Sequence, residues 1–233
     1  TVDGIKKSAD RGAGLRVLCN GARGFAATAD LSLNSLQRLA EEAVSTAQAS
    51  CAAQEKPVRL AEEESVIDTY RTPVEIDPED VPLSEKIDYL SACSREMLFV
   101  KGITLAESSL SWQKQEKLYL NTEGSIISQH LTECGAGIEA VAVKNDDMQK
   151  RSFPASFGGN FAAAGFEFIR EMPLKENARS TAEEAVALLS APACPRKITD
   201  IILESSQLAL QIHESCGHPA ELDRVLGSEA GYA

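Results

Sequence analysis

The feature that most restricts the fold of this chain is a change in the spacing of its apolar residues near residue 30. Residues 14–19 form a short, mostly apolar run, and residues 23–28 form a second run of similar length. Asn20-Gly21 lies between them and is a strong hairpin signal, because both residue types accept the positive φ angles of a tight turn. The sequence therefore predicts two antiparallel strands joined at Asn20-Gly21.

After residue 30 the apolar residues recur at intervals of three and four, which is the spacing of an amphipathic helix. These residues are Leu33, Leu36, Leu39, Ala40, Ala43, Val44 and Ala47. Ser32 is expected to be the N-cap, and the helix is expected to end near Ser50. Two strands and a covering helix make a small α+β unit, so residues 1–51 are interpreted as the remainder of an N-terminal α+β domain whose first elements precede Thr1.

Residues 52–83 are expected to be a linker, because prolines and acidic residues replace any clear periodicity. The prolines are Pro57, Pro73, Pro78 and Pro82. A second helix is predicted over residues 85–97, with Ser84 as its N-cap.

The segment after this helix predicts an antiparallel meander with one face against the helix. Strands are expected at residues 103–113, 117–120, 125–130 and 138–143, with a turn at residues 121–124. The last two strands are either one long strand or are interrupted by Cys134-Gly135-Ala136-Gly137. A helix over residues 181–189, capped by Ser180, completes a middle α+β region over residues 84–190.

Residues 191–233 are interpreted as the start of a C-terminal catalytic domain. Residues 198–203 predict a strand, and Ser205 or Ser206 can cap the helix that follows. The predicted fold class is therefore α+β, with mixed or antiparallel sheets and covering helices, followed by a strand–helix segment that carries the motif described next.

The composition is that of a globular protein without affinity for nucleic acid or membrane. The net charge of −12 opposes binding to phosphate backbones, which requires an excess of Lys and Arg. No apolar run approaches the roughly 18 residues of a membrane span. Six scattered cysteines without a C-x-x-C pair are typical of reduced thiols in a cytoplasmic protein.

Two of the three histidines of the chain lie within six consecutive residues, His213-Glu214-Ser215-Cys216-Gly217-His218. The pattern resembles H-E-x-x-H, which places two zinc-binding imidazoles on one helix face, but it is one residue longer. Residues five apart on a regular helix are separated by about 140°, against roughly 40° for residues four apart. We expect the helix to stop near Cys216 and turn at a left-handed Gly217, with Pro219 favouring the stop. A π-bulge that absorbs the extra residue is the alternative.

In either geometry, His213 and His218 are expected to bind zinc, and Glu214 is expected to act as the general base for a water molecule. A catalytic zinc usually has three protein ligands. The nearby candidates for the third are Cys216, Glu221, Asp223 and Glu229. His130, the remaining histidine, is expected to be structural or exposed rather than a ligand.

The residues around this motif resemble the TldD/PmbA (TldE) family of metallopeptidases, once described as modulators of DNA gyrase. Residues 206–227 look like the H-E-x-x-x-H region of the TldD-type members. Residues 10–17 and 24–28 are similar to the first domain of the family, and the Phe157-Gly158-Gly159 loop resembles its middle region.

The resemblance implies a zinc metallopeptidase that cleaves unfolded or flexible peptides inside a dimer, either a homodimer or a heterodimer with a PmbA/TldE-like subunit. It implies His213 and His218 as zinc ligands and Glu214 as the base. The third ligand of the family is a cysteine in a C-terminal part, and none of the six cysteines here matches it. Two alternatives stay open, namely a catalytically idle binding subunit and a structural metal site.

Overall fold

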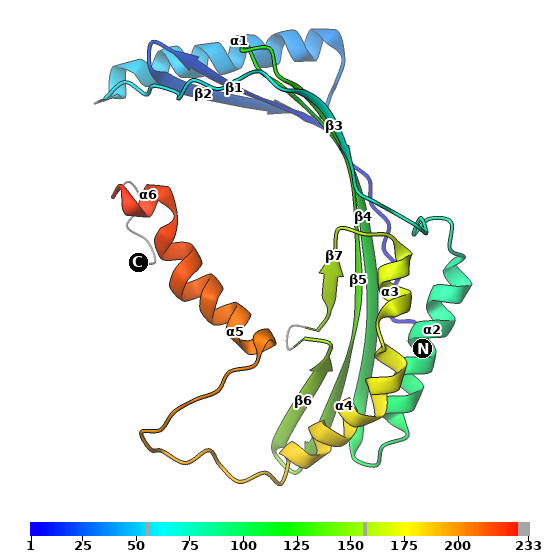
Figure 1. Cartoon of the computed structure of the whole chain (residues 1–233). Coiled ribbons are helices and arrows are strands. Elements are labelled where there is room, and N and C mark those ends of the chain that lie inside the picture. Colours follow the sequence, from blue (N-terminus) through cyan, green and yellow to red (C-terminus); the bar gives the residue numbers. More distant parts are fainter. Residues whose placement is uncertain (55, 156–157, 228–233) are drawn as a thin grey trace. The chain divides into compact units, whose positions relative to one another are not determined.

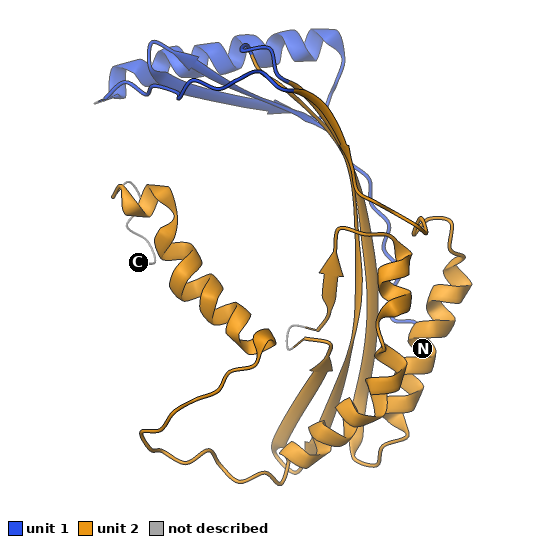
Figure 2. Cartoon of the chain, viewed as in Figure 1, with its two compact units in different colours: residues 1–66, 122–125 blue, residues 67–121, 126–233 orange. Residues whose placement is uncertain are grey.

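The computed structural model describes residues 1–54, 56–155 and 158–227, and the chain divides into two compact units that are described separately (Figure 1, Figure 2). The first unit comprises Thr1–Val66 and Thr122–Ser125, and the second comprises Ile67–Asn121 and Ile126–Ala233. The fold class is α+β as predicted, with antiparallel and mixed sheets covered by helices.

The first unit contains the predicted hairpin and its helix. Strands β1 (Ala13–Cys19) and β2 (Ala22–Thr28) pair antiparallel, and helix α1 spans Leu33–Ser50. Asn20 and Gly21 have φ angles of 51° and 82°, which confirms the tight turn. A short 3-10 helix (Cys51–Ala53) follows α1.

Helix α1 packs on one face of the hairpin through small and apolar side chains. Leu39 and Ala43 of α1 are buried against Ala26 of β2. A Cβ atom on Gly24 would lie 2.1 Å from the carbonyl oxygen of Ala43, so only glycine permits this approach of strand and helix. The hydroxyl of Ser32 accepts a bond from the backbone N–H of Ser35, which confirms the predicted N-cap.

The second unit is built on one long strand. Strand β5 (Ile126–Lys144) pairs antiparallel with β4 (Ile103–Leu120) along one edge. Its other edge is shared in turn by β3 (Ile67–Arg71), which runs parallel, and by β7 (Asn160–Ala162) and β6 (Asp147–Phe153), which run antiparallel. The sheet is therefore mixed, with β5 in its middle.

Three helices cover one face of this sheet: α2 (Leu83–Leu98), α3 (Phe166–Glu171) and α4 (Leu174–Leu188) (Figure 1). The core between helices and sheet is apolar and rich in small residues. Its buried members are Val81, Cys93, Met97, Cys134, Ala136, Ile138, Ala140, Ala142, Phe166, Ile169, Met172, Leu174, Ala178, Ala182 and Ala185. Even-numbered residues of β5 face the helices, because side chains alternate across a strand.

Strand β5 continues without interruption through Cys134-Gly135-Ala136-Gly137, which settles the question that the sequence left open. A Cβ atom on Gly135 would lie 2.2 Å from the carbonyl oxygen of Asn160, and one on Gly137 would lie 2.0 Å from that of Gly158. The glycines are therefore needed because the chain entering β7 crosses that face of the strand at close range.

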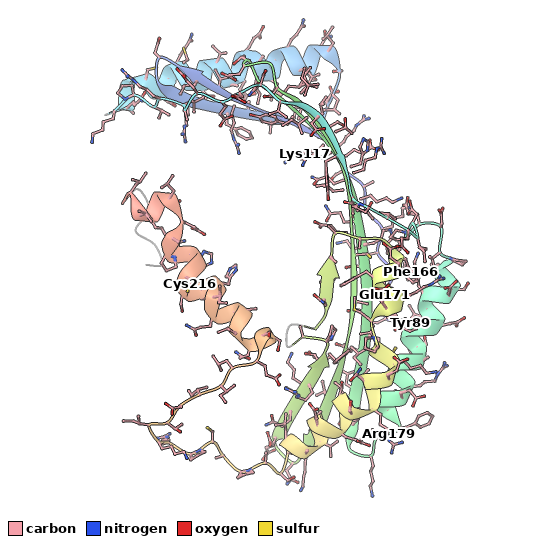
Figure 3. The ribbon with its side chains drawn as sticks, viewed as in Figure 1. Tyr89, Lys117, Phe166, Glu171, Arg179 and Cys216 are labelled. Carbon is pink, nitrogen blue, oxygen red and sulfur yellow. The ribbon has the colours of Figure 1, made fainter. Side chains whose placement is uncertain are left out.

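Polar contacts tie α2 to its surroundings. The Nζ of buried Lys86 donates to the carbonyl oxygens of Pro78 and Val81, with the second bond at 2.9 Å. The hydroxyl of Tyr89, labelled in Figure 3, donates to the carbonyl oxygen of Met172 at 3.1 Å. Burial raises the pKa of Tyr89 to about 12, so the hydroxyl keeps the proton that this bond requires.

Several expectations for the middle of the chain were wrong in detail. The predicted linker over residues 52–83 contains strand β3, which pairs with β5, and α2 begins one residue before its predicted cap at Ser84. The two strands predicted over residues 103–113 and 117–120 are one strand, because continuous pairing with β5 carries it through its polar stretch.

The helix predicted over residues 181–189 begins earlier, at Leu174. Ser180 is therefore not a cap but lies inside α4, where its hydroxyl donates to the carbonyl oxygen of Asn177. Elements β6, β7 and α3 had no strong periodicity in the sequence and were missed. Pairing with β5 and packing against the core stabilise them.

The C-terminal segment also differs from the expectation. Residues 198–203 form no strand; they are exposed and lack pairing, so their apolar composition alone was misleading. Helix α5 (Ser205–Ile212) begins after Glu204, and neither Ser205 nor Ser206 is its N-cap. Across the three described ranges, no helix combines the length and apolarity needed to cross a bilayer.

Candidate metal centre

The His213–His218 motif lies in a helical segment whose geometry changes at the motif itself. Helix α5 is followed by a π-helical turn (His213–Gly217), a 3-10 turn (His218–Ala220) and helix α6 (Leu222–Val225). The alternation of three helix types places each side chain of the site, because each type sets a different angular step between residues.

The π-helical turn absorbs the extra residue of the motif. The backbone N–H of His218 donates to the carbonyl oxygen of His213, which is the i→i+5 bond that defines this geometry. Gly217 has a φ of −65°, so the predicted left-handed turn at Gly217 is wrong and the π-bulge alternative is confirmed. His218 keeps helical angles although it precedes Pro219, which lies in the first turn of the 3-10 helix where its missing N–H costs no bond.

This turn brings the two imidazoles and the carboxylate of the motif together. The rings of His213 and His218 stand edge to face with centroids 4.6 Å apart. The Nε2 of His218 lies 3.9 Å from a carboxylate oxygen of Glu214. One ligand atom from each of His213, Glu214 and His218 lies within 4.8 Å of the others, which makes them the candidate metal-binding group of the described chain.

The donor set suits a zinc ion. Imidazole nitrogen and carboxylate oxygen are ordinary zinc ligands, and two ligand atoms on a tetrahedral ion lie about 3.4 Å apart when the bonds are about 2.1 Å. The 4.8 Å that encloses the three ligand atoms is wider than that separation. His218 and Glu214 keep 30% and 37% of their side-chain surface exposed, so an ion and a water molecule have access.

The other residues considered as ligands lie differently. Cys216, labelled in Figure 3, is an exposed free thiol on the π-helical turn and is outside the cluster. Asp223 accepts a bond from the backbone N–H of Arg224 at the start of α6. Glu229 lies outside the described residues, as does Phe157 of the loop used in the resemblance. His130 lies in β5, 3.7 Å from Glu116, and takes no part in the site.

Sequence reasoning treated Glu221 as a potential metal ligand and missed its actual contact. A carboxylate oxygen of Glu221 lies 2.8 Å from Nδ1 of His218, and its other oxygen lies 3.4 Å from Nε of Arg224. The spacing of three residues from His218 was the available signal, because side chains three apart lie on the same face of a helical turn. The sequence did not predict the 3-10 turn that makes this contact.

A mixed α+β fold with a His-Glu-His cluster on a π-helical turn defines a candidate metalloprotein, and comparison with known proteins identifies the family. The model of the PmbA/TldA metallopeptidase domain 1 matches residues 1–47, and that of the PmbA/TldA metallopeptidase central domain matches residues 76–190. The chain belongs to the TldD/PmbA metallopeptidase family.

Curated relatives agree with this assignment. A metalloprotease of Methanocaldococcus jannaschii is 28% identical over 98% of this chain and 49% of its own length. A metalloprotease TldD homolog of Haemophilus influenzae is 25% identical over 95% of this chain and 46% of its own length. The chain thus spans about half the length of the curated relatives it matches.

Solved structures confirm the fold. A protein of Thermotoga maritima, described as a candidate modulator of DNA gyrase, has a TM-score of 0.60 and 17% identity, and the match covers 83% of this chain and 41% of that one. A protein of Bacteroides thetaiotaomicron with a similar description has a TM-score of 0.57 and 11% identity, with 78% and 40% covered. At these identities the likeness concerns the fold alone.

Proposed function

We propose that this protein is a zinc-dependent peptidase of the TldD type that hydrolyses peptide bonds in unfolded or flexible peptides. The observation that carries the proposal is the π-helical turn that gathers His213, Glu214 and His218 within 4.8 Å. Membership of a family whose curated relatives are named metalloproteases supports the same reaction class.

In this proposal His213 and His218 hold the zinc ion. When bound, the ion would polarise the scissile carbonyl and make an attacking water molecule more acidic. Glu214 accepts the proton that this water releases and delivers it to the leaving amine nitrogen, which are the two steps of general base and general acid catalysis. A carboxylate oxygen of Glu214 lies 3.9 Å from Nε2 of His218, and this proximity supports a role for Glu214 beside a bound ion.

The proposal assigns Glu214 as the base rather than as a third ligand, and the two roles have different consequences. If Glu214 is the base, an isosteric amide in its place leaves metal binding intact and lowers only the rate of cleavage. If Glu214 is a ligand, the same change lowers the affinity for the metal. The complete enzyme is proposed to supply its third ligand from a further cysteine and to act as a dimer, either with itself or with a PmbA/TldE-like subunit.

The test compares the Glu214→Gln variant with a Glu204→Gln control, which makes the same charge change on the exposed residue before α5. Zinc content and cleavage of a fluorescently labelled, unstructured polypeptide are measured on the native protein. We expect Glu214→Gln to keep its zinc and to lose about 10²- to 10⁴-fold in turnover, while Glu204→Gln changes neither.

Three outcomes would count against the proposal. Unchanged cleavage by Glu214→Gln would remove Glu214 as the base. Loss of zinc together with cleavage in that variant would make Glu214 a ligand, and a wild-type protein that takes up no zinc would overturn the metal site altogether.

A further inference from the structure

The contact between Glu221 and His218 is formed by a specific backbone arrangement. The chain runs through a 3-10 turn at His218–Ala220, and the backbone N–H of Glu221 donates to the carbonyl oxygen of His218 at 3.2 Å. Side chains three residues apart eclipse one another in this geometry. Glu221 directly follows this turn, and its carboxylate reaches the imidazole edge of His218, with 2.8 Å between the oxygen and Nδ1.

Glu221 also occupies the N-cap position of α6, but its side chain does not cap that helix. At such a position a short polar side chain ordinarily accepts a bond from the N–H groups of the first turn. Here the carbonyl oxygen of Glu221 accepts the bonds from Arg224 and Val225, and the carboxylate points back to His218. The Nε of Arg224 lies 3.4 Å from the second carboxylate oxygen, within ion-pair distance.

The chemistry of this bond determines which nitrogen of His218 carries the proton. An ionised carboxylate can only accept hydrogen bonds, so Nδ1 must be the donor. In the neutral imidazole the lone pair is then on Nε2, which is the nitrogen on the side of Glu214, 3.9 Å away. Metal-binding histidines commonly have their second nitrogen bonded to a carboxylate, which fixes the tautomer and raises the basicity of the ligand nitrogen.

We propose that Glu221 is a positioning residue that holds His218 as its Nδ1–H tautomer and presents Nε2 to the metal. Glu221 is not itself a ligand, although the sequence allowed that role. The inference rests on the proposed zinc site, and it adds a residue that acts on the metal through His218. The side chain of Glu221 keeps 45% of its surface accessible.

The first measurement needs no metal. Long-range ¹H–¹⁵N spectra of the ring of His218, recorded on the whole metal-free chain at mildly alkaline pH where imidazole is neutral, report the tautomer directly. We expect the Nδ1–H form to dominate in the wild type and in Glu221→Gln, whose amide oxygen can still accept. In Glu221→Ala we expect a mixture of both tautomers. Asp223→Ala, which removes the neighbouring carboxylate, is the matched control and should resemble the wild type.

The second measurement is the zinc affinity of the same variants, obtained by competition with a chromophoric chelator. Glu221→Ala is expected to weaken zinc binding by about 10- to 100-fold, and Glu221→Gln by a smaller factor. Asp223→Ala should stay within about threefold of the wild type. If Glu221→Ala and Asp223→Ala lose the same amount of zinc affinity, the loss reflects only the removal of a negative charge, and the proposal is overturned.

The two measurements separate this inference from the proposed function. If the wild type binds no zinc, the proposed peptidase site fails, whereas the tautomer of His218 is still decided by the spectra. If zinc binds but the spectra of Glu221→Ala match those of the wild type, Glu221 has no positioning role and the peptidase proposal stands without it.

Discussion

The helix-covered sheet around β5 and the motif-bearing segment, residues 205–227, are stabilised by different interactions. The sheet region buries β5 residues such as Ile138 and α4 residues such as Leu174, each at 1% exposure or less. None of the described residues from 205 to 227 is buried. Geometry in the first region follows from packing, whereas geometry in the second follows from backbone hydrogen bonds and the contacts of a few polar side chains. Stability and metal binding should therefore respond to different substitutions.

The largest effect on stability is expected from the centre of the sheet. Ile138→Ala removes a fully buried side chain from β5 and should lower the free energy of unfolding by about 2–5 kcal/mol in urea titrations. The control is Ile126→Ala on the same strand, where 46% of the side chain is exposed, so a smaller loss is expected. If both variants lose the same free energy of unfolding, burial does not explain the stability of the sheet.

A smaller effect, with a defined pH dependence, is expected at Glu167 in the first turn of α3. Its carboxylate accepts bonds from the backbone N–H groups of Ile76 at 2.9 Å and Gly165 at 2.7 Å. Burial by itself would raise the pKa of Glu167, but these backbone bonds outweigh it and hold the pKa below its ordinary value. Glu167→Gln replaces one acceptor oxygen with a donor and should cost about 1–3 kcal/mol at neutral pH.

Because the pKa of Glu167 is lowered by folding, its contribution is complete above the unfolded value of about 4.3 and is lost as the pH falls through the folded value. The difference between wild type and Glu167→Gln should therefore shrink as the pH falls below about 5. Glu171→Gln on the exposed end of α3, labelled in Figure 3, should leave stability and its pH profile unchanged. A difference that grows with acidification would contradict the assignment.

The substitution with the smallest expected effect on the free energy of unfolding should have the largest effect on zinc affinity. His213→Ala removes an exposed side chain, so unfolding of the metal-free protein should shift by less than about 0.5 kcal/mol. Its zinc affinity should fall by more than the roughly 10- to 100-fold cost of losing an outer partner. His130→Gln, at the third histidine, should keep its zinc. Destabilisation of the metal-free His213→Ala protein would show that the segment is held by packing after all.

The elements with strong local patterns were predictable. The hairpin at Asn20-Gly21, helix α1 and its Ser32 cap follow from residue spacing and from turn and cap preferences, and all three are confirmed. Elements without such patterns were missed or misplaced: β3 was taken for linker, and residues 198–203 were taken for a strand. In both cases the deciding interaction is pairing with a distant strand, which β3 has with β5 and residues 198–203 lack.

The candidate site divides in the same way. The sequence by itself determined which chemical groups are available, because two histidines and a glutamate lie within six positions. Only the three-dimensional structure decided how they meet. A π-helical turn, rather than a left-handed Gly217, brings His218 beneath His213, and a 3-10 turn then places Glu221 on Nδ1. The π-helical, α-helical and 3-10 turns differ only in how many residues each backbone hydrogen bond spans. Residue spacing does not specify so small a difference, but it changes the direction of every side chain of the site.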